Sequence, residues 1–104
     1  MARFDVYRNP NRRSRERVPC LLDIQADLLS GLTTRLVVPL LPATEFGQPV
    51  EKLNPVFRIG SRAHVMATSE MAAIPTKSIG ERVATLEQHS AEILAAVDFL
   101  ISGF

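Results

Sequence analysis

CLLDIQ, residues 20–25, predicts a β-strand, because its alternation puts Cys20, Leu22 and Ile24 on one face. RLVVPLL, residues 35–41, is a second run that contains β-branched residues, which favour strands. Together the two runs predict an antiparallel β-sheet as the centre of the protein.

Neighbouring residues refine this prediction. In the opening strand, Phe4 and Val6 share one face, and Asp5 and Tyr7 share the other. Pro39 has no backbone N–H, so we expect its strand to lie at a sheet edge or to carry a bulge.

Three further segments follow as far as residue 80: a loop, a hairpin and a short strand. Prolines bracket residues 42–55, which predicts a loop with one short turn of structure. Residues 56–68 are typical of a hairpin in which Gly60 supplies the turn. Residues 74–80, IPTKSIG, are expected to form another short strand.

The apolar period changes near Leu86, where a helical stripe begins. At spacings of seven, four and three, the stripe comprises Leu86, Ile93, Val97 and Leu100. We predict a helix within residues 81–102, with Val83 extending the stripe at its start. Other apolar residues lie off the stripe: Leu94, Phe99 and Ile101. Such a helix must bury more than one face, either in the core or against a partner.

Length and composition indicate one globular domain over residues 1–104. Hydrophobic residues make up 46% and charged residues 22% of the chain. No apolar run approaches the roughly 20 residues of a membrane span, and the start of the chain lacks the apolar core of a signal peptide. The single cysteine, Cys20, is expected to be a small buried residue in a reducing, cytoplasmic environment.

The net charge of +1 hides an asymmetry. Residues 1–17 carry a balance of +4, from two acidic residues and six arginines: Arg3, Arg8, Arg12, Arg13, Arg15 and Arg17. The remaining residues carry a balance of −3. The arginine-rich stretch is either a solvated loop or a contact for phosphates or an acidic protein.

Catalytic and metal-binding motifs are not recognisable. His64 and His89 are widely spaced and are expected to be half-exposed structural residues, so we predict no metal site. Neither a nucleophile elbow nor a phosphate-binding loop occurs. Asp23 and Asp27 flank Gln25, and we expect Asp27 to cap a turn and Asp23 to face solvent. The protein is therefore expected not to be an enzyme and to need no cofactor.

Two groups of motifs carry a family resemblance. Phe-x-Val-Tyr, Asp-x-Gln-x-Asp and Val-x-Pro-Leu segments occur at Phe4, Val6, Tyr7, Asp23, Gln25, Asp27, Val37, Pro39 and Leu40. Later motifs occur at Ile59, Gly60, Met66, Thr68, Met71, Ala72, Ile74, Pro75, Ile79, Gly80 and Glu81. With these motifs over nearly the whole chain, the sequence resembles the CcdB family of toxins from toxin–antitoxin modules.

The resemblance implies a mostly β (α+β) fold, with a small SH3-like antiparallel β-barrel or sheet core and a C-terminal α-helix, in a homodimer. It also implies a type II toxin that binds the gyrase A subunit and traps the cleaved DNA–gyrase complex, and so inhibits this topoisomerase. A CcdA-like antitoxin neutralises such a toxin. Operator DNA is bound only by the toxin–antitoxin complex, which autoregulates transcription and serves plasmid maintenance.

Seven residues occupy the family's gyrase-contact positions: Leu28, Leu29, Asp98, Ile101, Ser102, Gly103 and Phe104. The best-known members end in Trp-Gly-Ile, which enters the open gyrase gate, whereas this chain ends in Ser-Gly-Phe. Loss of the aromatic anchor is expected to weaken binding by on the order of 2 kcal/mol. Asp98 also replaces a neutral amide. The resemblance thus gives the apolar end of the chain a role as a plug for another protein.

Four arginines are the predicted antitoxin contacts: Arg8, Arg12, Arg13 and Arg15. Three alternatives to gyrase poisoning stay open. One is a toxin of similar fold that cleaves messenger RNA, which would need an arginine and an acid/base partner in a basic groove. Another is a CcdB-like protein with weakened or lost gyrase poisoning. The third is a DNA-binding or scaffold module that uses residues 8–17.

Overall fold

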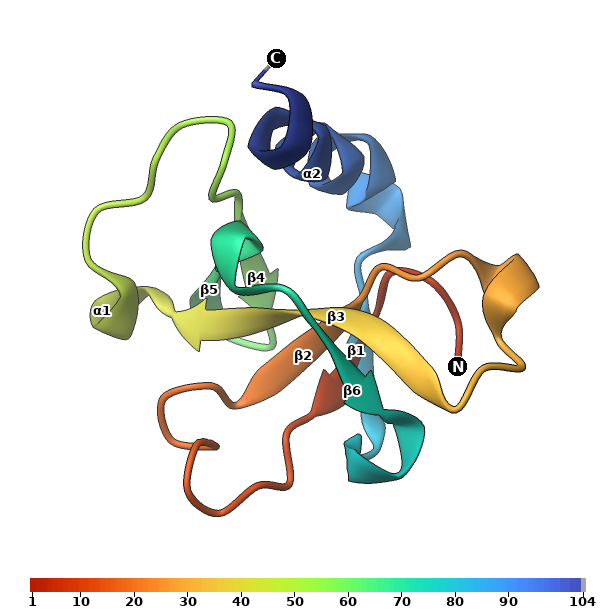
Figure 1. Cartoon of the computed structure of the whole chain (residues 1–104). Helices are drawn as coiled ribbons and strands as arrows, with labels where there is room; N and C mark the ends of the chain where they lie inside the picture. Colours follow the sequence, from red (N-terminus) through yellow and green to blue (C-terminus); the bar gives the residue numbers. More distant parts are fainter. Residues whose placement is uncertain (104) are drawn as a thin grey trace.

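A computed structural model describes residues 1–103, and Phe104 lies outside the described residues. Seven antiparallel strands form a curled half-barrel, with helix α2 packed on one side (Figure 1). The strand order is β4-β5-β3-β2-β1-β7, and β6 pairs with β3 off this path. The prediction of a mostly β fold with an antiparallel β core and a C-terminal helix is confirmed.

The described residues form seven strands, two α-helices and four 3-10 turns. The strands are β1 (Asp5–Arg8), β2 (Cys20–Asp23), β3 (Thr34–Pro42), β4 (Val56–Ile59), β5 (Arg62–Met66), β6 (Ala72–Pro75) and β7 (Arg82–Thr85). The α-helices are α1 (Ala43–Phe46) and α2 (Ser90–Ser102). Short 3-10 turns are η1 (Asp27–Leu29), η2 (Thr68–Glu70), η3 (Thr76–Ser78) and η4 (Glu87–His89).

The strand β3 is central, so the expectation of a sheet edge at Pro39 is wrong, and the β2–β3 register shows no bulge there; yet Pro39 is not fully hydrogen-bonded, as its missing N–H requires. On one side β3 pairs with β2, and Leu21 faces Pro39. On the other side residues 40–42 pair with β5 and residues 34–37 pair with β6. Pro39 lies at the junction, where its carbonyl accepts a hydrogen bond of 2.9 Å from the Ala67 N–H. Because the N–H and C=O of a strand residue point to the same side, the missing donor falls between two partner strands.

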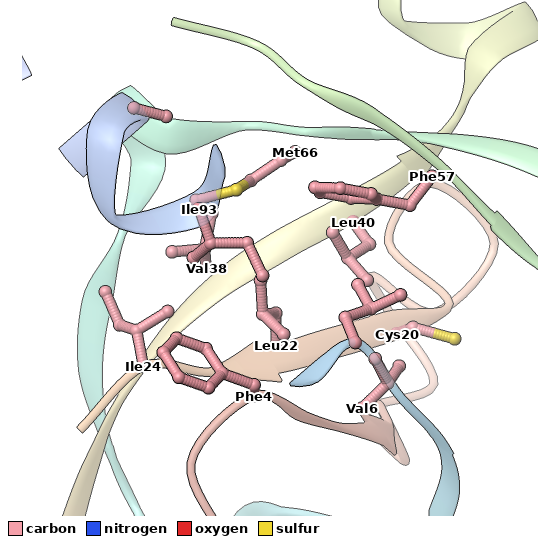
Figure 2. Packing of buried hydrophobic residues seen from close by; sticks show 12 residues of the cluster. Phe4, Val6, Cys20, Leu22, Ile24, Val38, Leu40, Phe57, Met66 and Ile93 are labelled. Carbon is pink, nitrogen blue, oxygen red and sulfur yellow. The ribbon is translucent and has the colours of Figure 1, made fainter. Parts of the chain in front are cut away.

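The predicted alternation of Cys20, Leu22 and Ile24 is confirmed in the main core (Figure 2). The buried residues are Phe4, Val6, Cys20, Leu22, Ile24, Val38, Leu40, Phe57, Met66, Leu86, Ile93 and Ala96. A second buried cluster comprises Val18, Leu21, Val37, Leu41 and Ala67. Leu21 and Leu22 therefore lie on opposite faces of β2, and both are buried. Burial on two faces explains why the central strands have nearly continuous apolar sequences.

The C-terminal helix begins later than the sequence predicted. Residues 82–85 form β7, which pairs with β1, and Val83 is an exposed strand residue rather than part of a helix. Arg82 Nε donates a hydrogen bond of 3.0 Å to Asp5 Oδ2 across this pairing. Residues 82–85, whose apolar pattern alone indicates neither strand nor helix, thus form a strand because they pair with β1. Helix α2 starts only at Ser90, after the η4 turn.

The remaining short elements largely match the prediction. The β4–β5 hairpin turns at Gly60, whose φ is 64°, and the short turn of structure predicted within residues 42–55 is the helix α1. The strand predicted over residues 74–80 is β6, which begins at Ala72 and ends at Pro75. The residues after Pro75 form η3 instead.

The titratable residues of the core are mainly structural. Cys20 is buried as predicted, and burial raises the pKa of its thiol, with an opposing contribution from Arg8. His64 is buried rather than half-exposed, and its Nδ1 lies 3.1 Å from the carbonyl oxygen of Arg62. His89 is half-exposed as predicted, with its ring centroid 5.0 Å from that of Phe57.

Gly80 allows β7 to approach β1 closely. Its N–H donates a hydrogen bond of 2.9 Å to the Arg8 carbonyl, and a Cβ at this position would lie 2.7 Å from that oxygen. We expect Gly80→Ala to lower the free energy of unfolding by about 1–3 kcal/mol, because backbone atoms must move. The matched variant Gly31→Ala meets no atom within 4 Å and is expected to be neutral or slightly stabilising. Urea unfolding of both variants measures the difference, and equal stabilities would contradict the close approach.

Candidate functional site

The turn η1 exposes apolar side chains between β2 and β3. Leu28 is 94% exposed, and Leu29 and Leu32 are also exposed. Solvent-facing leucines at successive positions gain nothing from the protein's own core, and clustered exposed apolar side chains are typical of interaction surfaces. We call residues 24–33 the leucine loop.

A buried ion pair joins β2 and β3, the two strands that flank the leucine loop. Asp23 is 0% and Arg35 1% exposed, and Arg35 Nε donates a hydrogen bond of 3.0 Å to Asp23 Oδ2. Arg35 Nη2 contacts the same oxygen, and Asp23 Oδ1 accepts a hydrogen bond of 3.0 Å from Gln25 N. The expectation that Asp23 faces solvent is therefore wrong. Its side chain lies on the side of β2 that carries Leu21, where Arg35 of β3 meets it.

Asp27 ties the leucine loop to the start of the chain. Its side chain makes no capping hydrogen bond to η1, contrary to the prediction. Instead, Asp27 Oδ1 accepts a hydrogen bond of 2.7 Å from Arg3 N, and Arg3 Nε donates one of 3.2 Å to the Ile24 carbonyl. Arg3 thereby contacts both the residue that follows β2, Ile24, and the first residue of η1, Asp27.

The last turn of α2 is a second exposed surface. Ile93 and Ala96 bury the first half of the helix in the core, whereas Ile101 is 73% exposed. Exposed residues that follow or flank this turn include Asp98, Ser102 and Gly103. The helix thus divides its apolar residues between the core and solvent, and Phe104 lies outside the described residues.

Gly103 ends α2 with a left-handed cap. Its φ is 77°, and its N–H donates a hydrogen bond of 2.9 Å to the Phe99 carbonyl. Glycine adopts this conformation without steric cost, which accounts for its place at the helix end.

The two exposed apolar surfaces lie apart. Figure 1 shows η1 at the right of the molecule and the C-terminal end of α2 at the top. The predicted gyrase-contact residues are thus all exposed where the structure describes them, yet one protomer does not bring them into a single patch.

The four arginines predicted to contact the antitoxin are exposed: Arg8, Arg12, Arg13 and Arg15. Arg8 Nε lies 3.1 Å from Glu81 Oε1, whereas the other three have no ion-pair partner within residues 1–103. Asn9 shapes this arginine loop, residues 8–18, because its Nδ2 donates hydrogen bonds to Val18 O at 2.8 Å and Ser14 Oγ at 3.0 Å. The loop therefore presents three unneutralised cations.

The part of the chain that the structure describes contains no cluster of three or more His, Cys, Asp or Glu side chains placed to hold a metal ion. Within the same residues, no helix is long and apolar enough to cross a membrane.

Sequence reasoning missed two side chains next to the leucine loop: Arg35, which pairs with Asp23, and Gln25, which bonds Leu29 and Leu36. Asp23 lies opposite Val37 in the β2–β3 register, two residues from Arg35 on the same face. Opposite charges at such diagonal positions of two strands are the signal that would have indicated a buried pair.

A comparison with protein families agrees with this architecture. A family model described as CcdB protein matches residues 3–103, which include all seven strands and both α-helices. The chain therefore belongs to the CcdB family of toxins from toxin–antitoxin modules.

Proposed function

We propose that this toxin binds the gyrase A subunit and traps the cleaved DNA–gyrase complex. The observation that carries the proposal is the exposure of apolar side chains at the family's contact positions, above all Leu28 and Ile101. Such side chains gain free energy when a partner removes them from water, at roughly 25 cal/mol per Å² of buried apolar surface. The protein acts by binding rather than as an enzyme.

The end of the chain sets the strength of the poison. Ser102 stands where the best-known members have Trp, so the two-surface contact forms without its aromatic anchor. Leu28 and Leu29 retain an apolar surface at the other contact. We therefore infer a gyrase poison of reduced affinity.

Purified gyrase, supercoiled DNA and this protein together test the proposal. We expect linear DNA to accumulate after detergent and protease treatment, in proportion to toxin concentration and only when gyrase is present. Absence of trapping at high toxin concentration would refute the proposal. RNA cleavage by the protein alone would instead support the ribonuclease alternative.

The proposed assembly is a cytoplasmic homodimer neutralised by a CcdA-like antitoxin. Leu94 and Val97 pack against the main core, whereas Leu100 of the same helix is 39% exposed, and this residue favours a second copy as the cover for α2. The toxin–antitoxin complex, rather than the toxin alone, binds operator DNA and autoregulates its own transcription. The module then serves plasmid maintenance.

The arginine loop is the proposed guide for an acidic antitoxin. Neutralising Arg12, Arg13 and Arg15 together to Gln should slow association several-fold and weaken its salt dependence, because exposed charges act mainly on association rate. Stability should change little, since all three side chains are exposed. Stopped-flow mixing with the antitoxin at several salt concentrations measures both effects.

The matched control neutralises three exposed cations elsewhere: Lys52, Arg58 and Arg62. This variant has the same net charge as the arginine-loop variant, so a general effect of charge would slow both equally. Equal slowing would remove the arginine loop from the proposed interface.

A further inference from the structure

We propose that Gln25 is a positioning residue, which holds the leucine loop in the conformation that presents Leu28 and Leu29 to the partner. The proposal rests on the proposed binding of gyrase A. Gln25 itself need not touch the partner, because its polar atoms are bonded within the protein.

Three hydrogen bonds place Gln25 at the base of the loop. Its backbone N–H donates to Asp23 Oδ1 at 3.0 Å. Its side-chain Oε1 accepts from Leu36 N at 3.0 Å, and its Nε2 donates to Leu29 O at 2.9 Å. The backbone of Gln25 is therefore tied to the end of β2, and its side chain links the strand β3 to the far end of η1.

Packing cannot fix the exposed turn, because Leu28 is 94% exposed and η1 buries none of its residues. Most of the other bonds of the turn are local. Leu29 N donates to Ala26 O at 2.9 Å, and Ser30 N donates to Asp27 O at 3.0 Å. These bonds shape the turn, whereas the Gln25 bond to Leu29 O ties its far end to the sheet and the Arg3 bond to Asp27 Oδ1 ties its near end to the start of the chain.

A continuous polar chain thus runs from the core to the surface. Arg35 holds Asp23, Asp23 holds the backbone of Gln25, and the side chain of Gln25 holds Leu29. The first two members are fully buried, whereas η1 buries none of its residues, so the chain connects the exposed turn to the core. A turn ordered before binding loses less conformational entropy when the partner arrives.

Loss of the Gln25 side chain should therefore weaken the partner's binding more than it weakens the fold. We expect Gln25→Ala to lower the affinity for gyrase A roughly tenfold, through both a slower association and a faster dissociation. In hydrogen exchange, the Leu36 and Leu32 amides should lose protection, because the first loses its acceptor and the second depends on the turn.

Gln25→Glu separates the effects of the two side-chain hydrogen bonds, one to Leu36 N and one to Leu29 O. A carboxylate still accepts from Leu36 N but has no hydrogen to donate to Leu29 O. We expect the Leu36 amide to keep its protection while the affinity for gyrase A falls about as far as in Gln25→Ala. A merely structural role would give the opposite pattern, in which affinity follows the protection of β3.

The matched control is Asn9→Ala, because Asn9 braces the arginine loop as Gln25 braces the leucine loop. Asn9 Nδ2 donates to Val18 O and Ser14 Oγ, and its Oδ1 accepts from Asn11 N at 3.1 Å. We expect Asn9→Ala to lose similar or greater stability yet to bind gyrase A with unchanged affinity.

Calorimetric titration of full-length dimeric protein with gyrase A distinguishes the outcomes. A wild-type protein that binds no gyrase A refutes the proposed function, and the positioning role with it. Wild-type binding together with unchanged affinity in Gln25→Ala, or in Gln25→Glu, refutes the positioning role alone. An equal loss of affinity in Asn9→Ala would attribute the effect to general destabilisation and would also refute that role.

Discussion

Replacing Arg35 by Met is expected to lower the free energy of unfolding by about 3–5 kcal/mol, because it leaves a buried carboxylate without its partner. Asp23 is 0% exposed and would keep only the hydrogen bond from Gln25 N. A domain of this size is stable by about 5–15 kcal/mol in total, so the loss is a large fraction of its stability. Urea unfolding followed by circular dichroism measures the change.

Two controls separate the charge from the size of the side chain. Arg58→Met removes an exposed arginine whose Nη1 donates to Ser61 O, and it should cost less than about 1 kcal/mol. The double variant Asp23→Leu with Arg35→Met replaces both charges by apolar groups and should recover most of the stability. If Arg35→Met cost no more than Arg58→Met, the ion pair would not stabilise the fold as inferred.

The sequence predicted the main core well because that core obeys a period of two. Apolar residues occupy every second position of two segments, Phe4 and Val6 in the first and Cys20, Leu22 and Ile24 in the second. This period is a local property of the sequence, so the main core can be predicted without knowledge of which strands pair.

The buried ion pair and β7 could not be predicted in the same way, because both depend on pairing between distant segments. A lone aspartate in a strand has the same local pattern whether it meets solvent or a buried arginine. Similarly, the four residues of β7 show neither a clear strand nor a clear helix period, and their place is fixed by pairing with β1. Non-local pairing, rather than propensity, decides such short segments.

The candidate site was located by resemblance rather than by local pattern. Leucines are usually buried, so the sequence alone gives no reason to expect Leu28 at 94% exposure. The hydrogen bonds of Gln25 to Leu36 and Leu29 were equally hidden, because they join residues of different elements. Sequence reasoning singled out the apolar end of the chain but left core and partner contacts open, and the structure shows Ile101 at 73% exposure.

Deleting residues 102–104 is expected to abolish trapping of cleaved DNA while leaving the fold nearly intact. Ser102 and Gly103 are exposed, and the core contacts of α2 come from Ile93 and Ala96, well before the end. Loss of the Gly103 cap bond should cost about 1 kcal/mol or less. Gyrase trapping and a thermal melt of the same preparation measure the two effects together.

Gly103→Glu asks whether the last residues enter a confined space on the partner. In the free protein no atom lies within 4 Å of the added Cβ, so the only cost is the left-handed φ of 77°. That cost is about 1 kcal/mol, which lowers the melting temperature by about 4–8 °C. The matched variant Gly103→Ala carries the same backbone cost without the bulk or the charge, so their melting temperatures should agree. Trapping by Gly103→Glu should be lost, and trapping by Gly103→Ala only reduced.

Ser102→Trp is expected to strengthen trapping, because it restores the aromatic anchor at the exposed end of α2. A gain of about 2 kcal/mol corresponds to roughly a thirtyfold increase in affinity. The gain should vanish when Gly103→Glu is added, since an anchor that cannot enter its pocket contributes nothing. Full trapping by the three-residue deletion would refute the plug, and the apolar end of α2 would then belong to a contact between the protein's own subunits. Unfolding by the same deletion would assign these residues to the fold instead.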